Sequence, residues 1–117
     1  MGSMMALRAH TRGGPEVLVY ESAPRPTTGT NEVLVAVHAA AITFAELTWP
    51  ETWASRGVDR TPVIPSHEFS GVAAEVGDGA TGLSAGDVVY GLVPFDRDGA
   101  AAEFVSVPAT NLSRRPR

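Results

Sequence analysis

The 117-residue sequence contains no cysteine and no lysine, so all nine of its basic residues are arginines. The absence of cysteine excludes disulfide bonds and zinc sites built on thiolates. No apolar run is long enough to span a bilayer, and the start lacks a signal-peptide pattern, so we expect a cytoplasmic protein that does not enter membranes. Arginine without lysine, together with abundant alanine, is typical of a GC-rich bacterial source.

The chain also has little positive charge to offer a polyanion. Its formal net charge is −4 and its pI is about 5.2, so no basic stripe for nucleic acid is expected. With 44% hydrophobic and 19% charged residues, it belongs to the ordinary globular class and can form one domain. We interpret residues 1–4 as an expression scar, residues 5–113 as the domain and residues 114–117 as a solvated basic tail.

Short apolar segments alternate with glycine, proline and aspartate turn signals, which is typical of a mostly β barrel or sandwich. A Gly-Gly-Pro turn at 13–15 joins the first two segments into a hairpin, and the residues from 22 to 31 are predicted to form a loop. The predicted strands are 6–11, 17–20, 32–42, 69–76, 88–90 and 101–107.

A short helix is expected after the third strand. Thr43 is placed to cap its amino terminus, with Glu46 at the capping-box position. Pro50 is expected to end this helix, and residues 52–61 are expected to form a surface lid or loop.

The segment 63–76 holds the most informative pair, His67 followed by Glu68, at the mouth of a buried strand. An imidazole beside a carboxylate suits metal ligation, proton transfer or support of a ligand-facing wall. His67 is therefore a zinc ligand, a polar group lining a cleft, or a structural histidine. Glu68 is either a carboxylate at a strand end, bonded to backbone or an arginine, or a catalytic base.

Four motifs in order carry a family resemblance. They are Asn-Glu-Val-Leu-Val-Ala-Val at 31–37, Ser-His-Glu-Phe-Ser-Gly-Val at 66–72, Gly-Asp-Val-Val at 86–89 and Ala-Glu-Phe-Val at 102–105. Together they resemble the amino-terminal GroES-like catalytic domain of the medium-chain dehydrogenases/reductases over residues 5–113. The resemblance implies a mostly β fold, a partly open GroES-like β-barrel with short helical turns.

The resemblance also predicts whether the protein binds zinc and which class of substrate it reduces. The zinc branch has a cysteine ligand where this chain has Thr43, and a four-cysteine lobe where this chain has about ten residues without cysteine. We therefore expect no zinc and place the chain with the zinc-independent quinone oxidoreductases and enoyl reductases. That branch uses NADPH to reduce a quinone or enone, and it commonly has asparagine at the position of Thr43.

The resemblance implies roles for individual residues. Thr43 and His67 are the expected catalytic residues, and Thr43 and Glu46 are expected near the nicotinamide and its ribose. Trp49, Trp53 and Glu68 are expected to border the substrate cleft, although both tryptophans could be ordinary packing aromatics.

Family members continue into a Rossmann domain in cis, with a glycine-rich phosphate turn between a strand and a helix. The Gly-Gly at 13–14 and the Gly-Asp-Gly at 77–79 do not lie in such a unit, so we expect neither NADPH binding nor turnover from these residues alone. One alternative is a stand-alone binding module that forms homo-oligomers. Another is a small lyase or cyclase that uses the cleft without nicotinamide.

Overall fold

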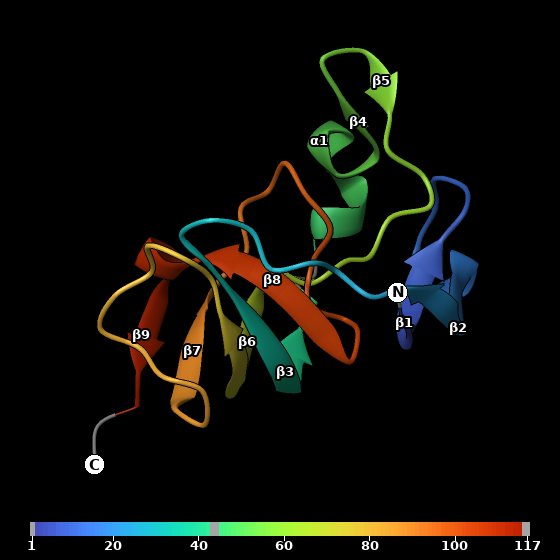
Figure 1. The fold of residues 1–117 in the computed structure, drawn as a ribbon. Coiled ribbons are helices and arrows are strands. Elements are labelled where there is room, and N and C mark those ends of the chain that lie inside the picture. Colours follow the sequence, from blue (N-terminus) through green and yellow to red (C-terminus); the bar gives the residue numbers. More distant parts are fainter. Residues whose placement is uncertain (1, 43–44, 116–117) are drawn as a thin grey trace.

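The computed structural model describes residues 2–42 and 45–115, and its regular elements are mainly antiparallel strands (Figure 1). The strands are β1 (Ser3–Ala9), β2 (Leu18–Pro24), β3 (Glu32–Ala41), β4 (Ala54–Ser55), β5 (Val58–Asp59), β6 (Glu68–Val76), β7 (Val88–Leu92), β8 (Phe104–Pro108) and β9 (Leu112–Arg114). The helical turns are 3₁₀ turns at Pro15–Val17, Glu46–Thr48 and Ala109–Asn111 and the four-residue helix α1 (Pro50–Trp53). The expected mostly β fold with short helical turns is confirmed, and its sheets do not close into a complete barrel.

The main sheet has the strand order β8-β3-β6-β7-β9 and holds the largest part of the core. Strand β3 lies between β8 and β6, and its β-branched residues Val33 and Val35 are fully buried. Leu34, on the opposite face, is buried as well, as the apolar run at the start of this strand predicted. The second half of β3 is exposed from His38 onward, so the strand projects beyond the core.

The amino-terminal hairpin forms a separate two-stranded sheet, with Ser3 opposite Pro24 and Ala9 opposite Leu18. The hairpin is confirmed, but β2 runs to Pro24, where a loop was predicted. Pairing with β1 satisfies the backbone there and overrides the weak local signal. The hairpin includes Ser3 and Met4, and Met4 is only 5% exposed, so these two residues are part of the folded domain.

The helical turn after the third strand ends at Thr48, before Pro50, as predicted. Pro50 also begins α1, which was not predicted, because the first helical position needs no backbone N–H and suits the fixed φ of proline. The expected lid at 52–61 contains instead the end of α1 and the small hairpin β4–β5, which stand apart from the main sheet in Figure 1. Strand β9 was not predicted, because its three residues have no periodicity and form a strand only by pairing with β7.

The segment 63–67 connects the hairpin, the lobe of α1 and the main sheet. The amide of Val63 donates to the carbonyl of Ala9 at 3.0 Å. The segment 99–101 runs alongside, with Gly99 N donating to Ile64 O at 2.7 Å and Ala100 N to Ser66 O at 2.6 Å. His67 therefore enters β6 from a backbone that is fixed on both sides. Among the described residues, no helix is long and apolar enough to cross a membrane.

One ion pair at the edge of the main sheet predicts how stability depends on pH. Glu32 lies 2.9 Å from Arg97 Nη1 and accepts from the Ser106 hydroxyl at 3.1 Å. The hydrogen bond from Arg97 is the main cause that lowers the pKa of Glu32 below its ordinary value of 4.5. A lowered carboxyl pKa stabilises the fold above pH 4.5, and this contribution is lost as the pH falls through the folded-state pKa.

We expect Glu32→Gln to remove this contribution. The free energy of unfolding of the variant should therefore fall less between neutral and acidic pH than that of the wild type. The effect should be modest, because the Glu32 side chain is 24% exposed and solvent screens the pair. Urea unfolding at about pH 6 and about pH 3 measures the difference. Glu51→Gln, at an exposed glutamate, is the control, and equal pH profiles for wild type and Glu32→Gln would contradict the prediction.

Candidate functional site

The candidate site is organised by Ser66, a buried residue with a left-handed backbone (φ 83°). This conformation is costly for a residue with a side chain, so the surroundings must hold it in place. Its amide donates to Glu46 Oε2 at 3.1 Å, and its hydroxyl donates to the carbonyl of Ala41 at 2.7 Å. The resulting turn directs the next residue, His67, inward and the following one, Glu68, outward.

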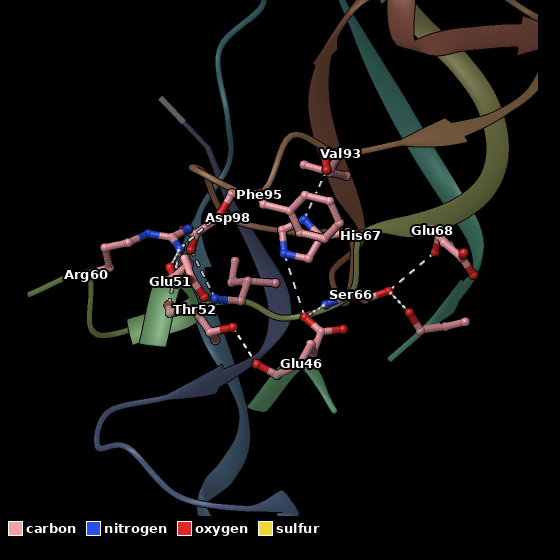
Figure 2. A network of polar contacts seen from close by, with 12 residues as sticks. Glu46, Glu51, Thr52, Arg60, Ser66, His67, Glu68, Val93, Phe95 and Asp98 are labelled. Atoms are coloured by element: carbon pink, nitrogen blue, oxygen red, sulfur yellow. Dashed lines mark hydrogen bonds and ion pairs between the residues drawn. The ribbon is translucent and has the colours of Figure 1, made fainter. Parts of the chain in front are cut away.

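The His67 ring is buried, and each of its nitrogens faces a protein oxygen (Figure 2). Nδ1 lies 3.1 Å from the carbonyl oxygen of Val93, which can only accept, so Nδ1 carries the hydrogen of this bond. Nε2 lies 3.6 Å from Glu46 Oε2, and the two form an ion pair when the imidazole is protonated. The orientation of the ring is thereby set from two sides.

Glu46 is fully buried and connects three parts of the site. Its carboxylate contacts Ser66 and His67, while its backbone carbonyl accepts from the Thr52 hydroxyl at 2.5 Å. The predicted capping box is wrong for Glu46: the 3₁₀ turn begins at Glu46 itself, its cap is Ala45, and no side chain caps it. Thr43, the other residue of that prediction and an expected catalytic and cofactor-binding residue, lies outside the described residues.

An aromatic wall covers the His67 ring. The Phe95 ring packs against it with a centroid distance of 4.6 Å, and Trp49 meets Phe95 edge to face at 5.7 Å. Phe95 is 53% exposed, so the wall has a solvent-facing side. Sequence reasoning placed Trp49 at the cleft but missed Phe95, whose one signal was an aromatic residue beside Pro94 at the start of a polar turn.

Arg60, which sequence reasoning also missed, joins this wall to the lobe of α1. Its Nη1 donates to the carbonyl of Glu51 at 2.6 Å and lies 3.2 Å from the carbonyls of Thr52 and Phe95. These oxygens belong to the end of a helix and to a separate loop. One guanidinium therefore fixes the lobe and the Phe95 loop relative to each other.

The other two expected cleft residues lie elsewhere. Trp53 is 4% exposed in a cluster with Ala9, Leu47 and Val63, and its Nε1 donates to the carbonyl of Leu47 at 2.9 Å. The Glu68 side chain is exposed and points away from the His67 ring in Figure 2. His67, Glu46 and Trp49 are thus brought together, whereas Trp53 and Glu68 are not part of the same cluster.

A family model described as the alcohol dehydrogenase GroES-like domain matches residues 29–117, which is most of the chain. The chain belongs to this family. The resemblance given by the four sequence motifs is therefore confirmed at the level of the GroES-like domain.

Relatives of the GroES-like domain include enzymes with different activities. The L-threonine 3-dehydrogenase of Bacillus velezensis is 32% identical over a match that covers 80% of this chain and 34% of the relative. The quinone oxidoreductase of Coxiella burnetii is 25% identical with a TM-score of 0.81, covering 99% of this chain and 38% of that one. A cobalt- and zinc-bound alcohol dehydrogenase from Pyrobaculum aerophilum is 27% identical with a TM-score of 0.82, covering 97% and 41%. The chain therefore spans about a third of the length of the curated relatives it matches.

The described residues do not fit a zinc ion at His67. The sequence has no cysteine, and the described residues contain no group of three histidine, aspartate or glutamate side chains placed to hold a metal. Both nitrogens of His67 already face protein oxygens. A zinc site needs three or four such donors around one point, so this donor set does not supply one.

Proposed function

We propose that the chain is the substrate-side domain of a cytoplasmic, bacterial oxidoreductase that reduces a quinone or enone with NADPH and without zinc. The observation that carries the proposal is the arrangement of His67, whose two ring nitrogens face Glu46 and the Val93 carbonyl. The Val93 carbonyl holds the ring through Nδ1, and among the described residues Nε2 and Glu46 are not joined by a third donor that could complete a metal site, so we assign the ring to a fixed part of a wall. This favours the quinone oxidoreductases over the metal-bound alcohol dehydrogenases among the relatives.

In this proposal the aromatic wall of Trp49 and Phe95 receives the substrate. Quinones and enones are planar and apolar, and they pack well against aromatic faces. His67 lies beneath Phe95, so we assign it the role of positioning the wall, with Glu46 holding the imidazole. Thr43 stays the proposed polar contact to substrate and cofactor.

The described residues do not fit the phosphates of a dinucleotide. Their sheets pair antiparallel, and they contain no unit of parallel strands joined by a glycine-rich turn and a helix. We therefore assign NADPH binding to a Rossmann domain in cis and expect neither NADPH binding nor turnover from this domain by itself.

Nuclear magnetic resonance on the isotope-labelled chain tests these assignments with three probes. A tetrasubstituted benzoquinone should shift the Trp49 indole and the Phe95 amide saturably, and Phe95→Ala should weaken this binding about tenfold. Tyr20→Ala, at an exposed aromatic residue outside the wall, should leave it unchanged. No saturable shift would overturn the substrate assignment, and a zinc-induced shift of the His67 ring nitrogens would overturn the zinc-free assignment. A micromolar dissociation constant for NADPH by calorimetry would contradict the expectation that this domain by itself does not bind NADPH.

Self-association is a second candidate function, favoured by apolar side chains on the outer face of β7. Val88, Tyr90 and Leu92 alternate along this strand and are 41%, 50% and 51% exposed. Exposed apolar side chains grouped in this way are typical of a surface that a partner covers. Light scattering separates the two candidates, because a monomer at all accessible concentrations excludes the second.

A further inference from the structure

We propose that the domain has a second binding site, separate from the aromatic wall, that takes a small monocarboxylate with an apolar body and holds its carboxylate through Arg25. The site is a cavity of about 450 Å³ between the amino-terminal hairpin, strand β8 and the loops around Pro62 and Asp98. Its volume falls within the range of about 300–1,000 Å³ found for small-molecule sites. None of the described residues of the aromatic wall and its His67–Glu46 support lines it, so the two sites do not overlap.

The floor of this cavity is apolar. Met4, Ala23 and Ile64 are buried there as one cluster, and Phe104 of β8 packs against them. An apolar ligand body would displace water from these side chains, which is favourable in proportion to the area covered. The floor therefore selects a ligand with a hydrocarbon part over an inorganic ion.

Two of the three arginines at the cavity are already paired. Arg97 lies 2.9 Å from Glu32 Oε2, and its Nη1 lies 3.3 Å from the carbonyl of Ser106. The Arg8 Nε lies 3.1 Å from Glu21 Oε2, an ion pair whose geometry makes no hydrogen bond. Each of these two guanidinium groups thus has a carboxylate of the protein as its ion-pair partner.

Arg25 is the third arginine that lines the cavity. Its guanidinium carbon lies 4.1 Å from the centroid of the Phe104 ring, and no carboxylate within residues 2–42 and 45–115 forms an ion pair with it. A guanidinium stacked on an aromatic face keeps its N–H donors in its own plane, where they can bind both oxygens of a carboxylate. Phe104 thus holds this donor group in place beside the apolar floor.

The charged groups at the cavity leave one cation for a ligand. Arg97 pairs with Glu32 and Arg8 with Glu21, so Arg25 is the arginine of the lining that pairs with no carboxylate of the described residues, while Glu32 and Asp98 lie on the same lining. Asp98 is fixed there, because its Oδ1 accepts from the Ile64 amide at 3.0 Å. A second negative charge on the ligand would meet these carboxylates without a cation of its own, so the cavity favours a monoanion over a phosphate dianion.

The test is a titration of the full chain, followed by amide chemical shifts, with 4-phenylbutyrate, with the neutral 4-phenylbutanol and with inorganic phosphate. We expect saturable shifts of Ala23, Ile64 and Phe104 with 4-phenylbutyrate and a dissociation constant of about 1 mM, as is typical of a ligand with twelve heavy atoms. 4-Phenylbutanol and phosphate should each bind at least about tenfold more weakly, because each lacks one of the two features that the cavity recognises.

Variants of Arg25 complete the test. Arg25→Gln should weaken 4-phenylbutyrate about tenfold, Arg25→Lys should have an intermediate effect, and Arg12→Gln, at an arginine that does not line the cavity, should have none. Equal binding of the alcohol, equal binding of phosphate, or unchanged binding by folded Arg25→Gln would each overturn the proposal. The Trp49 and Phe95 signals should stay unshifted, so the result is independent of the proposed quinone site.

Discussion

Replacing Glu46 with alanine is expected to destabilise the domain by about 3 kcal/mol. The carboxylate is fully buried, and its Oε2 accepts from the Ser66 amide and faces His67. Alanine would leave the Ser66 N–H without this acceptor, would remove the carboxylate that faces the His67 ring, and would open a cavity between them. Ser66 would also lose a contact that holds its left-handed backbone, so the turn that orients His67 would relax.

Two matched variants separate the parts of this effect. Glu46→Gln keeps the volume and an oxygen that can accept from Ser66, so we expect it to cost only about 1 kcal/mol. Glu51→Ala removes an exposed carboxylate five residues away and should change stability by less than about 0.5 kcal/mol. Urea unfolding followed by tryptophan fluorescence measures all three. If Glu46→Ala were as stable as Glu51→Ala, the carboxylate would not be holding the site together.

Gly99→Ala is expected to have an effect of similar size, about 3 kcal/mol, through overpacking. A Cβ at this position would collide with the carbonyl oxygens of Ser66 and Pro65, both of which are backbone atoms that cannot rotate away. The glycine is required here because two backbones approach closely. Alanine would push segment 99–101 off segment 64–66 and break the bonds of Gly99 N to Ile64 O and of Ala100 N to Ser66 O.

Hydrogen exchange tests whether Gly99→Ala separates segment 99–101 from segment 64–66. In Gly99→Ala the amides of Ala100 and Ala101, which donate to Ser66 and Pro65, should lose protection before the amides of β3 do. Gly2→Ala is the control, because the added Cβ there has its nearest contact at 3.6 Å, an ordinary van der Waals distance. Uniform loss of protection across the domain, or a stability equal to that of Gly2→Ala, would show that the close approach of the two segments is not the cause.

Both variants act on the same element, the connection of segment 64–67 to its neighbours. Glu46 holds it through a side chain, and Gly99 allows a second backbone to lie against it. In the proposed function this element sets the ring of His67 and, through it, the wall of Phe95. A loss of stability in either variant should therefore be accompanied by weaker quinone binding, even though neither residue belongs to the wall.

Much of the fold could be predicted from local pattern. Strands β3, β6 and β7 and the first hairpin were found within a few residues, because β-branched residues alternate between clear turn signals. The errors occurred where tertiary contacts override weak local preference. A second helix starts at Pro50, β9 forms because β7 offers it an edge, and residues 54–59 contain a hairpin that no alternation indicates.

The candidate site was predicted less completely. His67, Glu46 and Trp49 were singled out and are clustered in the structure, but Ser66, Phe95 and Arg60 were not foreseen. Trp53 was predicted either to border the cleft or to be a packing aromatic, and it is a packing residue whose indole donates to a carbonyl inside the lobe. Sequence spacing gives no access to such pairings, because residues 20 to 35 positions apart meet only through the path of the chain between them.

The sequence by itself determined the family, the antiparallel β architecture and the absence of any thiolate for a metal, because these follow from motifs, periodicity and composition. Only the tertiary structure decided what the histidine contacts. Glu46 lies 20 positions before Ser66 and Val93 lies 26 positions after His67, and folding brings both to the same buried ring. A hydrogen bond depends on distance and direction in space, and those are set by packing rather than by order along the chain.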